Sequence, residues 1–223
     1  MAKDYINLIK VELDKAEKLS SNLAREEIAM FKVKTANQTL YEASLLPIPV
    51  SLWDAFWFEG ELCCLFADSN IGKSILAVQI AEEIAKKRKV IYFDFELSNI
   101  QFLMRYKDKN GTLYRFQDNF LRAVINIDSP LIENIEESII DAIINVVFEY
   151  QANIIIIDNV TYLNSATDKG DIAGKLMIKL TMLKVKHNLS ILVLAHTPKR
   201  SLTKPITQND LAGSKRLFNF FDS

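Results

Sequence analysis

Residues 62–74 read Leu62-Cys63-Cys64-Leu65-Phe66-Ala67-Asp68-Ser69-Asn70-Ile71-Gly72-Lys73-Ser74. An apolar run of strand length is followed by a polar loop, and an amphipathic helical segment covers residues 74–87. The loop has the spacing G-x-x-x-x-G-K-[ST], which between a strand and a helix is typical of phosphate-binding loops. We therefore predict a nucleotide-binding segment made of Ala67, Asp68, Ser69, Asn70, Ile71, Gly72, Lys73, Ser74 and Ile75.

The chemistry of such a loop explains its spacing. Backbone N–H groups at the helix N-terminus point at a phosphate, and the helix dipole favours negative charge there. Lys73 would reach the β- and γ-phosphates, and the Ser74 hydroxyl would coordinate Mg²⁺. Ala67 replaces the first glycine of the pattern. If its backbone must sit at φ > 0, the alanine costs on the order of 1 kcal/mol.

Strand-like and helix-like segments alternate from Glu61 onward. The expected strands are residues 62–66, 90–95, 121–127, 153–157 and 190–195, and the expected helices are residues 74–87, 131–150 and 172–187. These strands are apolar without polar alternation, so both faces of the sheet are expected to be buried under helices. The pattern predicts an α/β fold with a doubly wound, mostly parallel sheet.

Asp158 ends the run Asn153-Ile154-Ile155-Ile156-Ile157-Asp158. Ligands of open α/β sheets collect at the carboxyl ends of the strands. Asp158 is thus placed to hold Mg²⁺ together with Ser74, by way of a water molecule. The alternative is an aspartate that only caps the following turn.

Glu96 ends the run Val90-Ile91-Tyr92-Phe93-Asp94-Phe95-Glu96, directly after the phosphate-loop helix. It could polarise an attacking water as the general base of nucleotide hydrolysis. Asp94 competes for this role, because alternate strand residues share a face. We favour Glu96 since it lies nearer the ligand edge, and a carboxylate that only solvates the strand end is the alternative.

His196 follows the apolar run Ile191-Leu192-Val193-Leu194-Ala195. A lone histidine is usually structural. Its position at the same sheet edge as Asp158 and Glu96 instead favours a donor that senses the γ-phosphate and transmits its loss to the next loop.

The N-terminal region is predicted to be helical, because apolar residues recur at helical spacing from Lys3 to about Ala36. It could pack on its own domain or dock on a neighbouring subunit. Pro47 and Pro49 then mark a boundary. We expect a helical extension over residues 1–45 and one domain over residues 46–223. The aromatic residues Trp53, Phe56, Trp57 and Phe58 are expected to pack in a core or lid.

Composition narrows the class of protein. The 27 Lys and Arg residues nearly balance the 28 Asp and Glu residues, which excludes gross electrostatic attraction to nucleic acid but not local basic patches. The two cysteines, Cys63 and Cys64, are adjacent in an apolar run, so core packing is expected rather than a disulfide. We expect a cytoplasmic protein without a membrane segment.

These elements, in this order, resemble the RecA-like ATPase superfamily, and within it the hexameric plasmid replicative helicases typified by RepA together with DnaB-type helicases. The resemblance runs from about Leu45 to Asp222. It implies ATP and Mg²⁺ as ligands, catalytic roles for Lys73, Glu96 and His196, and a homo-oligomer, with a hexamer favoured. Strands that the family has after Asp222 are missing, so the domain could be truncated.

The resemblance also implies roles for the basic residues that come after His196. Lys199 and Arg200 match residues that reach into the neighbouring subunit's nucleotide site, although solvated surface charge is an equal alternative. Lys204, Lys215 and Arg216 lie in the segment that resembles the loop binding single-stranded nucleic acid, and residues 199–216 hold five basic residues against one acidic residue.

The motifs support two hypotheses of function. The first is an ATP-hydrolysing, helicase-like motor that acts on DNA in the replication or mobilisation of a plasmid or mobile element. The second is a nucleotide-gated switch or scaffold with little turnover. A small-molecule kinase is less favoured, because the sequence has no Arg-rich lid segment.

Overall fold

The computed structural model describes residues 31–130, 135–159, 170–197, 205–207, 211 and 219–223. The chain divides into two compact units, Met1–Ile48 and Pro49–Ser223. The division between an extension at residues 1–45 and a domain at residues 46–223 stays a prediction. Among the described residues, no helix combines the length and apolar character needed to cross a bilayer.

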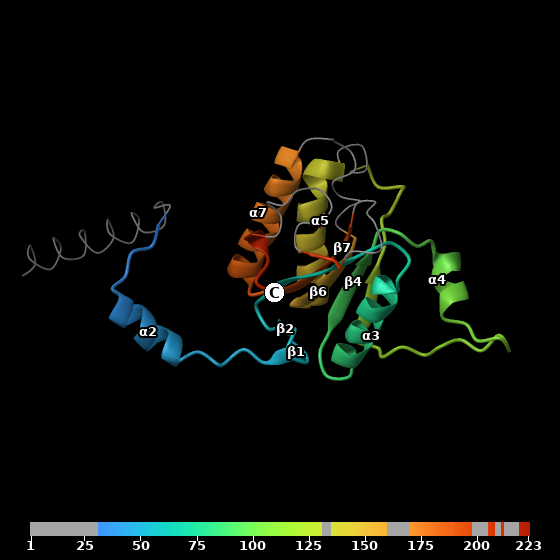
Figure 1. The fold of residues 1–223 in the computed structure, drawn as a ribbon, viewed down its shortest axis with the longest axis horizontal. Coiled ribbons are helices and arrows are strands. Elements are labelled where there is room, and N and C mark those ends of the chain that lie inside the picture. The colour runs from blue at the N-terminus through green and yellow to red at the C-terminus, as the bar shows by residue number, and fades with distance from the viewer. Residues whose placement is uncertain (1–30, 131–134, 160–169, 198–204, 208–210, 212–218) are drawn as a thin grey trace, which may run out of the picture. The chain divides into compact units, whose positions relative to one another are not determined.

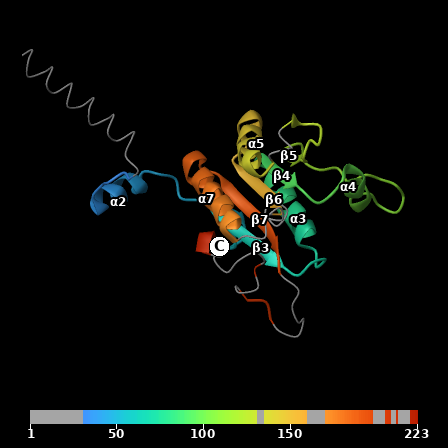
Figure 2. The ribbon, with the colours of Figure 1, turned by 90° about the horizontal axis from the view of Figure 1, so that it is seen from above.

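The larger unit is built on a parallel five-stranded sheet with the strand order β3-β7-β6-β4-β5 (Figure 1). Its strands are β3 (Leu62–Ala67), β4 (Val90–Asp94), β5 (Phe120–Ala123), β6 (Ile154–Asp158) and β7 (Ser190–His196). Helix α3 (Lys73–Ala85) covers one face, and α5 (Ile135–Tyr150) and α7 (Gly170–His187) cover the other (Figure 2). The predicted doubly wound parallel α/β fold is confirmed.

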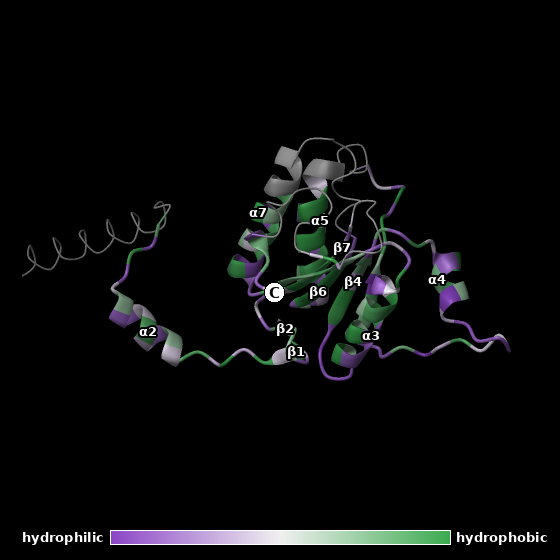
Figure 3. Ribbon diagram, in the orientation of Figure 1, coloured by the Kyte–Doolittle hydropathy of each residue, from purple (hydrophilic) through white to green (hydrophobic). Residues whose placement is uncertain are grey.

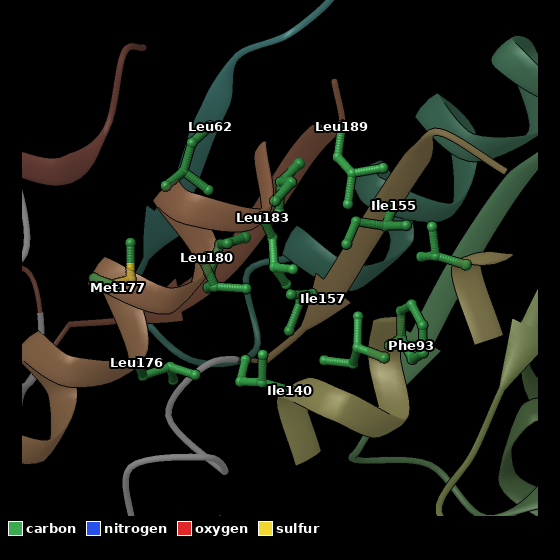
Figure 4. Packing of buried hydrophobic residues seen from close by; sticks show 14 of the residues in the cluster. Leu62, Phe93, Ile140, Ile155, Ile157, Leu176, Met177, Leu180, Leu183 and Leu189 are labelled. Carbon is green, nitrogen blue, oxygen red and sulfur yellow. The ribbon is translucent and has the colours of Figure 1, made fainter. Parts of the chain in front are cut away.

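The two faces of the sheet are sorted by the two-residue period of the strands. In β6, Ile155 and Ile157 belong to the core under α5 and α7, whereas Ile154 and Ile156 belong to the core under α3. Figure 4 shows the first core, where Leu180 and other α7 side chains meet the sheet. Because both faces are buried, every residue of β4 and β6 is buried, and these two strands are mainly hydrophobic in Figure 3.

Helices α5 and α7 end by the same device. Gln151 and Asn188 come directly after them at φ values of 51° and 50°, in the left-handed region that stops a helix. Each is followed within three residues by a strand, β6 or β7. This reversal places the carboxyl ends of β6 and β7 at the same edge as the carboxyl end of β3.

The register brings the strand tips together in pairs. Ala67 at the end of β3 lies opposite His196 at the end of β7. Asp94 at the end of β4 lies opposite Asp158 at the end of β6. Since β7 lies between β3 and β6, the phosphate loop and the Asp158 strand flank His196.

Several elements differ from those expected. The expected strand at residues 121–127 is shorter and begins one residue earlier, because β5 pairs with β4 only from Phe120 to Ala123. Helix α4 (Asn99–Arg105) was not expected, and a capping box between Ser98 and Gln101 starts it. Two short strands, β1 (Ser51–Trp53) and β2 (Trp57–Phe58), form an antiparallel hairpin.

The aromatic residues of this hairpin separate into core and surface. Trp57 is buried in the core beside α3, and Trp53 packs against that core. Phe56 is 67% exposed, so for this residue the expectation of core packing is wrong. It occupies the turn between β1 and β2, where its side chain is open to solvent, although its carbonyl oxygen lies 3.7 Å from the Cys63 sulfur of β3.

The free edge of β3 is occupied by the last two residues of the chain. The backbone N–H of Asp222 donates to Leu62 O at 2.9 Å, and Cys64 N donates to Ser223 O at 2.9 Å. The Asp222 side chain also accepts from Leu62 N and pairs with Lys184. Cys63 is buried and Cys64 partly buried, and both are free thiols.

The smaller unit contains helix α2 (Ala36–Ser44). Thr35 caps it, since its hydroxyl accepts from Gln38 N at 3.2 Å. The expected helical region ended at about Ala36, where this helix instead begins. The expected helices before residue 31 lie outside the described residues.

Candidate functional site

The phosphate loop connects β3 to α3 and has the predicted spacing. Gly72, the N-cap residue of α3, has φ 99°, a conformation that favours glycine strongly. Asn70 has φ 63°, and asparagine tolerates this region better than most residues do. The positive-φ positions of the loop are therefore filled by suitable residues.

Ala67 does not carry the penalty considered from the sequence. It is the last residue of β3 and belongs to the strand ladder with His196. The positive-φ residues of the loop are Asn70 and Gly72, whereas Ala67 is extended. The condition for a cost at this position is not met, because strand geometry suits alanine at least as well as glycine.

The N-terminus of α3 fits an anion. Gly72 has no side chain to accept from the first N–H groups of the helix, and Leu76 N makes the first helical bond, to Gly72 O at 2.9 Å. The backbone N–H groups of the first turn, before Leu76, make no bond within the helix. They and the helix dipole are what phosphate-binding helices use. Ile71 and Ile75 are exposed, so their expected contribution to nucleotide binding rests on the backbone.

Lys73 lies at the centre of the site and is only 7% exposed. Its Nζ donates to Ala67 O at 2.9 Å, to Asp68 O at 2.8 Å and to His196 Nδ1 at 3.0 Å. Burial lowers the pKa of the ammonium, and the carboxylates of Asp158, Glu96 and Asp68 oppose that shift. A phosphate would replace carbonyl dipoles by a full negative charge, so the lysine fits this ligand.

Asp158 and Ser74 lie together beside the lysine. The Ser74 hydroxyl and the Tyr92 phenol both hydrogen-bond to the Asp158 carboxylate, which is buried. Burial raises the pKa of Asp158, these two hydrogen bonds oppose the shift, and the charges of Glu96 and Asp94 add to it. A hydroxyl and a carboxylate side by side are oxygen ligands of the kind Mg²⁺ prefers.

Asp158→Asn should stabilise the protein when nucleotide and Mg²⁺ are absent. The amide keeps an oxygen that accepts from Tyr92 and removes a charge that burial disfavours. We expect a melting temperature a few degrees above that of wild type at pH 7 in EDTA, since each kcal/mol is worth about 2–4 °C in a chain of this size. Mg²⁺ with ATP should then stabilise wild type more than the variant.

The stability gained by Asp158→Asn should depend on pH. A raised carboxyl pKa means that the folded state binds the proton more tightly than the unfolded state, so the charge costs stability above that pKa. The advantage of Asp158→Asn should shrink as the pH falls from 7 through the raised pKa. Asp141→Asn, on the exposed surface of α5, is the matched control and should show no advantage. An advantage that grows on acidification would contradict this account.

Glu96 lies two residues beyond β4, in the turn that leads to α4. One of its carboxylate oxygens accepts from the Asn159 amide, and His196 Nε2 lies 3.2 Å from that oxygen. Its side chain is 37% exposed, so solvent reaches it. These contacts leave the carboxylate able to meet a water molecule.

Asp94, the competing candidate, is engaged elsewhere. Its Oδ1 accepts from Glu96 N at 3.1 Å and Leu97 N at 2.9 Å, and its Oδ2 accepts from Arg122 Nε at 2.9 Å. The side chain is 1% exposed. With both oxygens occupied and no access to solvent, Asp94 suits a general base poorly, which supports the choice of Glu96.

His196 connects the lysine to the glutamate. An ammonium can only donate, so His196 Nδ1 accepts from Lys73 and the ring proton lies on Nε2. Nε2 then donates toward Glu96, and the Asn159 amide nitrogen, which lies 2.9 Å from Nε2, donates to the same Glu96 oxygen and not to the ring. Ser69 Oγ is also 3.4 Å from Nδ1. The predicted residues Lys73, Glu96 and His196 thus form one chain of contacts.

Two further residues of the site, Asn159 and Thr197, were not predicted from the sequence. Asn159, buried next to Asp158, touches both Glu96 and His196 Nε2. Thr197 donates to the Asp68 carboxylate through its hydroxyl and to Ala67 O at 3.2 Å through its N–H. A polar residue directly after a strand tip was the available signal for both. The remaining predicted residues, Lys199, Arg200, Lys204, Lys215 and Arg216, lie outside the described residues.

A parallel sheet, a loop with glycine at a left-handed position, a buried lysine at a helix start and carboxylates at neighbouring strand tips define a P-loop nucleoside triphosphatase. A family model described as AAA domain matches residues 27–201, more than half of the chain. The chain therefore belongs to the AAA domain family of P-loop ATPases. No curated protein matches it. The finer resemblance to replicative helicases stays a prediction.

Proposed function

We propose that this protein hydrolyses ATP with Glu96 as the general base and uses the energy to act as a motor on DNA. The observation that carries the hydrolytic part is the contact chain from Lys73 through His196 to Glu96. It joins a phosphate-binding group to a solvent-accessible carboxylate. A group that binds phosphate and a group that activates water are the two requirements of the reaction.

Each residue then has a defined task. The backbone N–H groups at the start of α3 and the Lys73 ammonium bind the phosphates and balance their charge. Ser74 and Asp158 would hold Mg²⁺, which supplies positive charge to the phosphate oxygens when bound. Glu96 orients a water molecule and takes its proton, and Asn159 and His196 fix the orientation of the carboxylate.

The motor part rests on the segment that comes after β7. Thr197 binds both Ala67 and Asp68 of the phosphate loop. The chain continues from it into residues 199–216, with five basic residues against one acidic residue. A change at the phosphates could thus reach a segment suited to a polyanion. Like the helicases it resembles, the protein would work as an oligomer, with a hexamer favoured and Lys199 or Arg200 completing the neighbouring site.

Steady-state ATPase assays at low salt, with and without single-stranded DNA, test the motor. We expect DNA to raise the rate, and added salt to weaken this response, because phosphate contacts release counterions. Lys204→Gln/Lys215→Gln/Arg216→Gln should lose the stimulation. The matched variant Lys107→Gln/Lys109→Gln/Arg115→Gln removes the same charges from an exposed surface elsewhere and should keep it. Turnover that is indifferent to DNA would favour the nucleotide-gated switch.

A further inference from the structure

Arg122 on the edge strand β5 makes hydrogen bonds to the segment that carries Glu96. Its three guanidinium nitrogens contact three different acceptors: Nε donates to Asp94 Oδ2 at 2.9 Å, Nη1 to Asn99 Oδ1 at 2.7 Å and Nη2 to Leu97 O at 2.6 Å. The guanidinium also lies 4.4 Å from the centre of the Phe102 ring. One side chain of β5 therefore holds both sides of the turn and the start of α4.

Asp94, at the end of β4, also binds the backbone of this segment. While one of its oxygens binds Arg122, the other accepts the backbone N–H groups of Glu96 and Leu97. Phe95, which lies between Asp94 and Glu96 in the chain, donates its backbone N–H to Asp158 O at 2.8 Å. The backbone of the turn is thus tied to β4, β5 and β6. Within the part of the chain that the structure describes, the Glu96 side chain is held at its carboxylate end, by Asn159 and His196.

These three hydrogen bonds require an arginine. Lysine has a single ammonium nitrogen, which cannot reach acceptors spread along a planar fork. The pair is also largely buried, with side-chain exposures of 17% for Arg122 and 1% for Asp94. Buried ion pairs are weak sources of stability because of their desolvation cost, so a specific arrangement is a better account of this one.

We propose that Arg122 and Asp94 are positioning residues that set the place of the Glu96 carboxylate in the site. The proposal rests on the proposed role of Glu96 as general base. Neither residue contacts the phosphate loop through any described hydrogen bond. Their loss should therefore slow hydrolysis while leaving ATP affinity nearly unchanged.

The test compares Arg122→Met and Arg122→Lys with wild type in turnover number, ATP affinity and melting temperature. We expect turnover to fall by roughly 10-fold in both variants, below the 10²-fold that a ~1 Å misplacement can cost, with ATP affinity within about threefold. The lysine variant keeps the charge and serves where the methionine variant folds poorly. Asp94→Asn should also lower the turnover number, since it removes the negative charge of the ion pair with Arg122.

Arg88→Met is the matched control. Arg88 is a half-buried arginine of the same domain. It precedes β4, pairs with Glu59 and lies close to Asn153. It should lose comparable stability and keep its turnover number. If Arg122→Met behaves in the same way, with stability lost and turnover intact, the proposal is wrong.

A double variant distinguishes a positioning role of Arg122 from a general loss of structure. When Arg122→Met is combined with Glu96→Gln, residual turnover should not fall further, because the group that Arg122 positions is already disabled. An equal fall in both backgrounds would overturn the proposal. Full activity of Glu96→Gln alone would instead refute the proposed role of Glu96, so the two failures are distinguishable.

Discussion

Glu96→Gln should bind ATP but hydrolyse it about 10²- to 10⁴-fold more slowly than wild type. The amide cannot take a proton from water. Its oxygen can still accept from Asn159 and His196, so the geometry of the turn is expected to survive. Phosphate release at saturating ATP measures turnover, and titration with a fluorescent ATP analogue measures binding.

Glu83→Gln is the control for the chemical change itself. Glu83 lies on the exposed side of α3, where it pairs with Lys86. This variant should match wild type in both assays. A Glu96→Gln protein that retains more than about a tenth of wild-type turnover, well above the range expected for losing a general base, would show that another group activates the water.

Lys73→Met should weaken ATP binding on the order of 100-fold and reduce hydrolysis in proportion. Losing one hydrogen bond to a charged group costs about 1.5–3 kcal/mol, or roughly 10- to 100-fold in affinity, and Lys73 is expected to contact two phosphates. The stability of the nucleotide-free protein should change little, since burial of the ammonium offsets its contacts with Ala67 and Asp68. Calorimetry and thermal melting with and without Mg·ATP measure both effects.

Lys87→Met is the matched control, because Lys87 is exposed and lies two residues beyond the end of α3. It should bind ATP as wild type does. Equal binding by Lys73→Met and wild type would place the nucleotide elsewhere in the molecule.

Most of the sheet could be predicted from the sequence because its strands are apolar on both faces. The four isoleucines Ile154 to Ile157 and the run at Ile191 are too short for helices and too uniform for surface strands. Helix α4 and the β1–β2 hairpin gave no such signal. Ile100, Leu103 and Met104 do recur at helical spacing, but α4 is only seven residues long, and a short apolar run does not distinguish a helix from a strand. Its capping box was the local signal.

The candidate site could be predicted only as a set of strand tips. Asp158 and His196 each end an apolar run, and the rule that ligands gather at carboxyl ends brings them to one edge. The contacts among them depend on strand order. Because β7 lies between β3 and β6, His196 meets Lys73 and Glu96 together. Local patterns do not specify that order.

Arg122 shows the same limit of local patterns. It lies in a short stretch of β5 without a motif of its own, and its partners Asp94, Leu97 and Asn99 precede it by more than twenty residues. Its contacts form only when β5 pairs with β4. The cost assigned to Ala67 could not be judged without its backbone angles either, since the strand extends one residue further than expected.

We infer that one site, built from Lys73 and Glu96, binds ATP and cleaves it. Single-turnover hydrolysis of γ-labelled ATP by an excess of protein tests it most directly, with wild type and Glu96→Gln assayed side by side in Mg²⁺. We expect both proteins to bind the label and only wild type to release labelled phosphate at an appreciable rate. Bound label that wild type does not cleave, or equal release by both proteins, would contradict it.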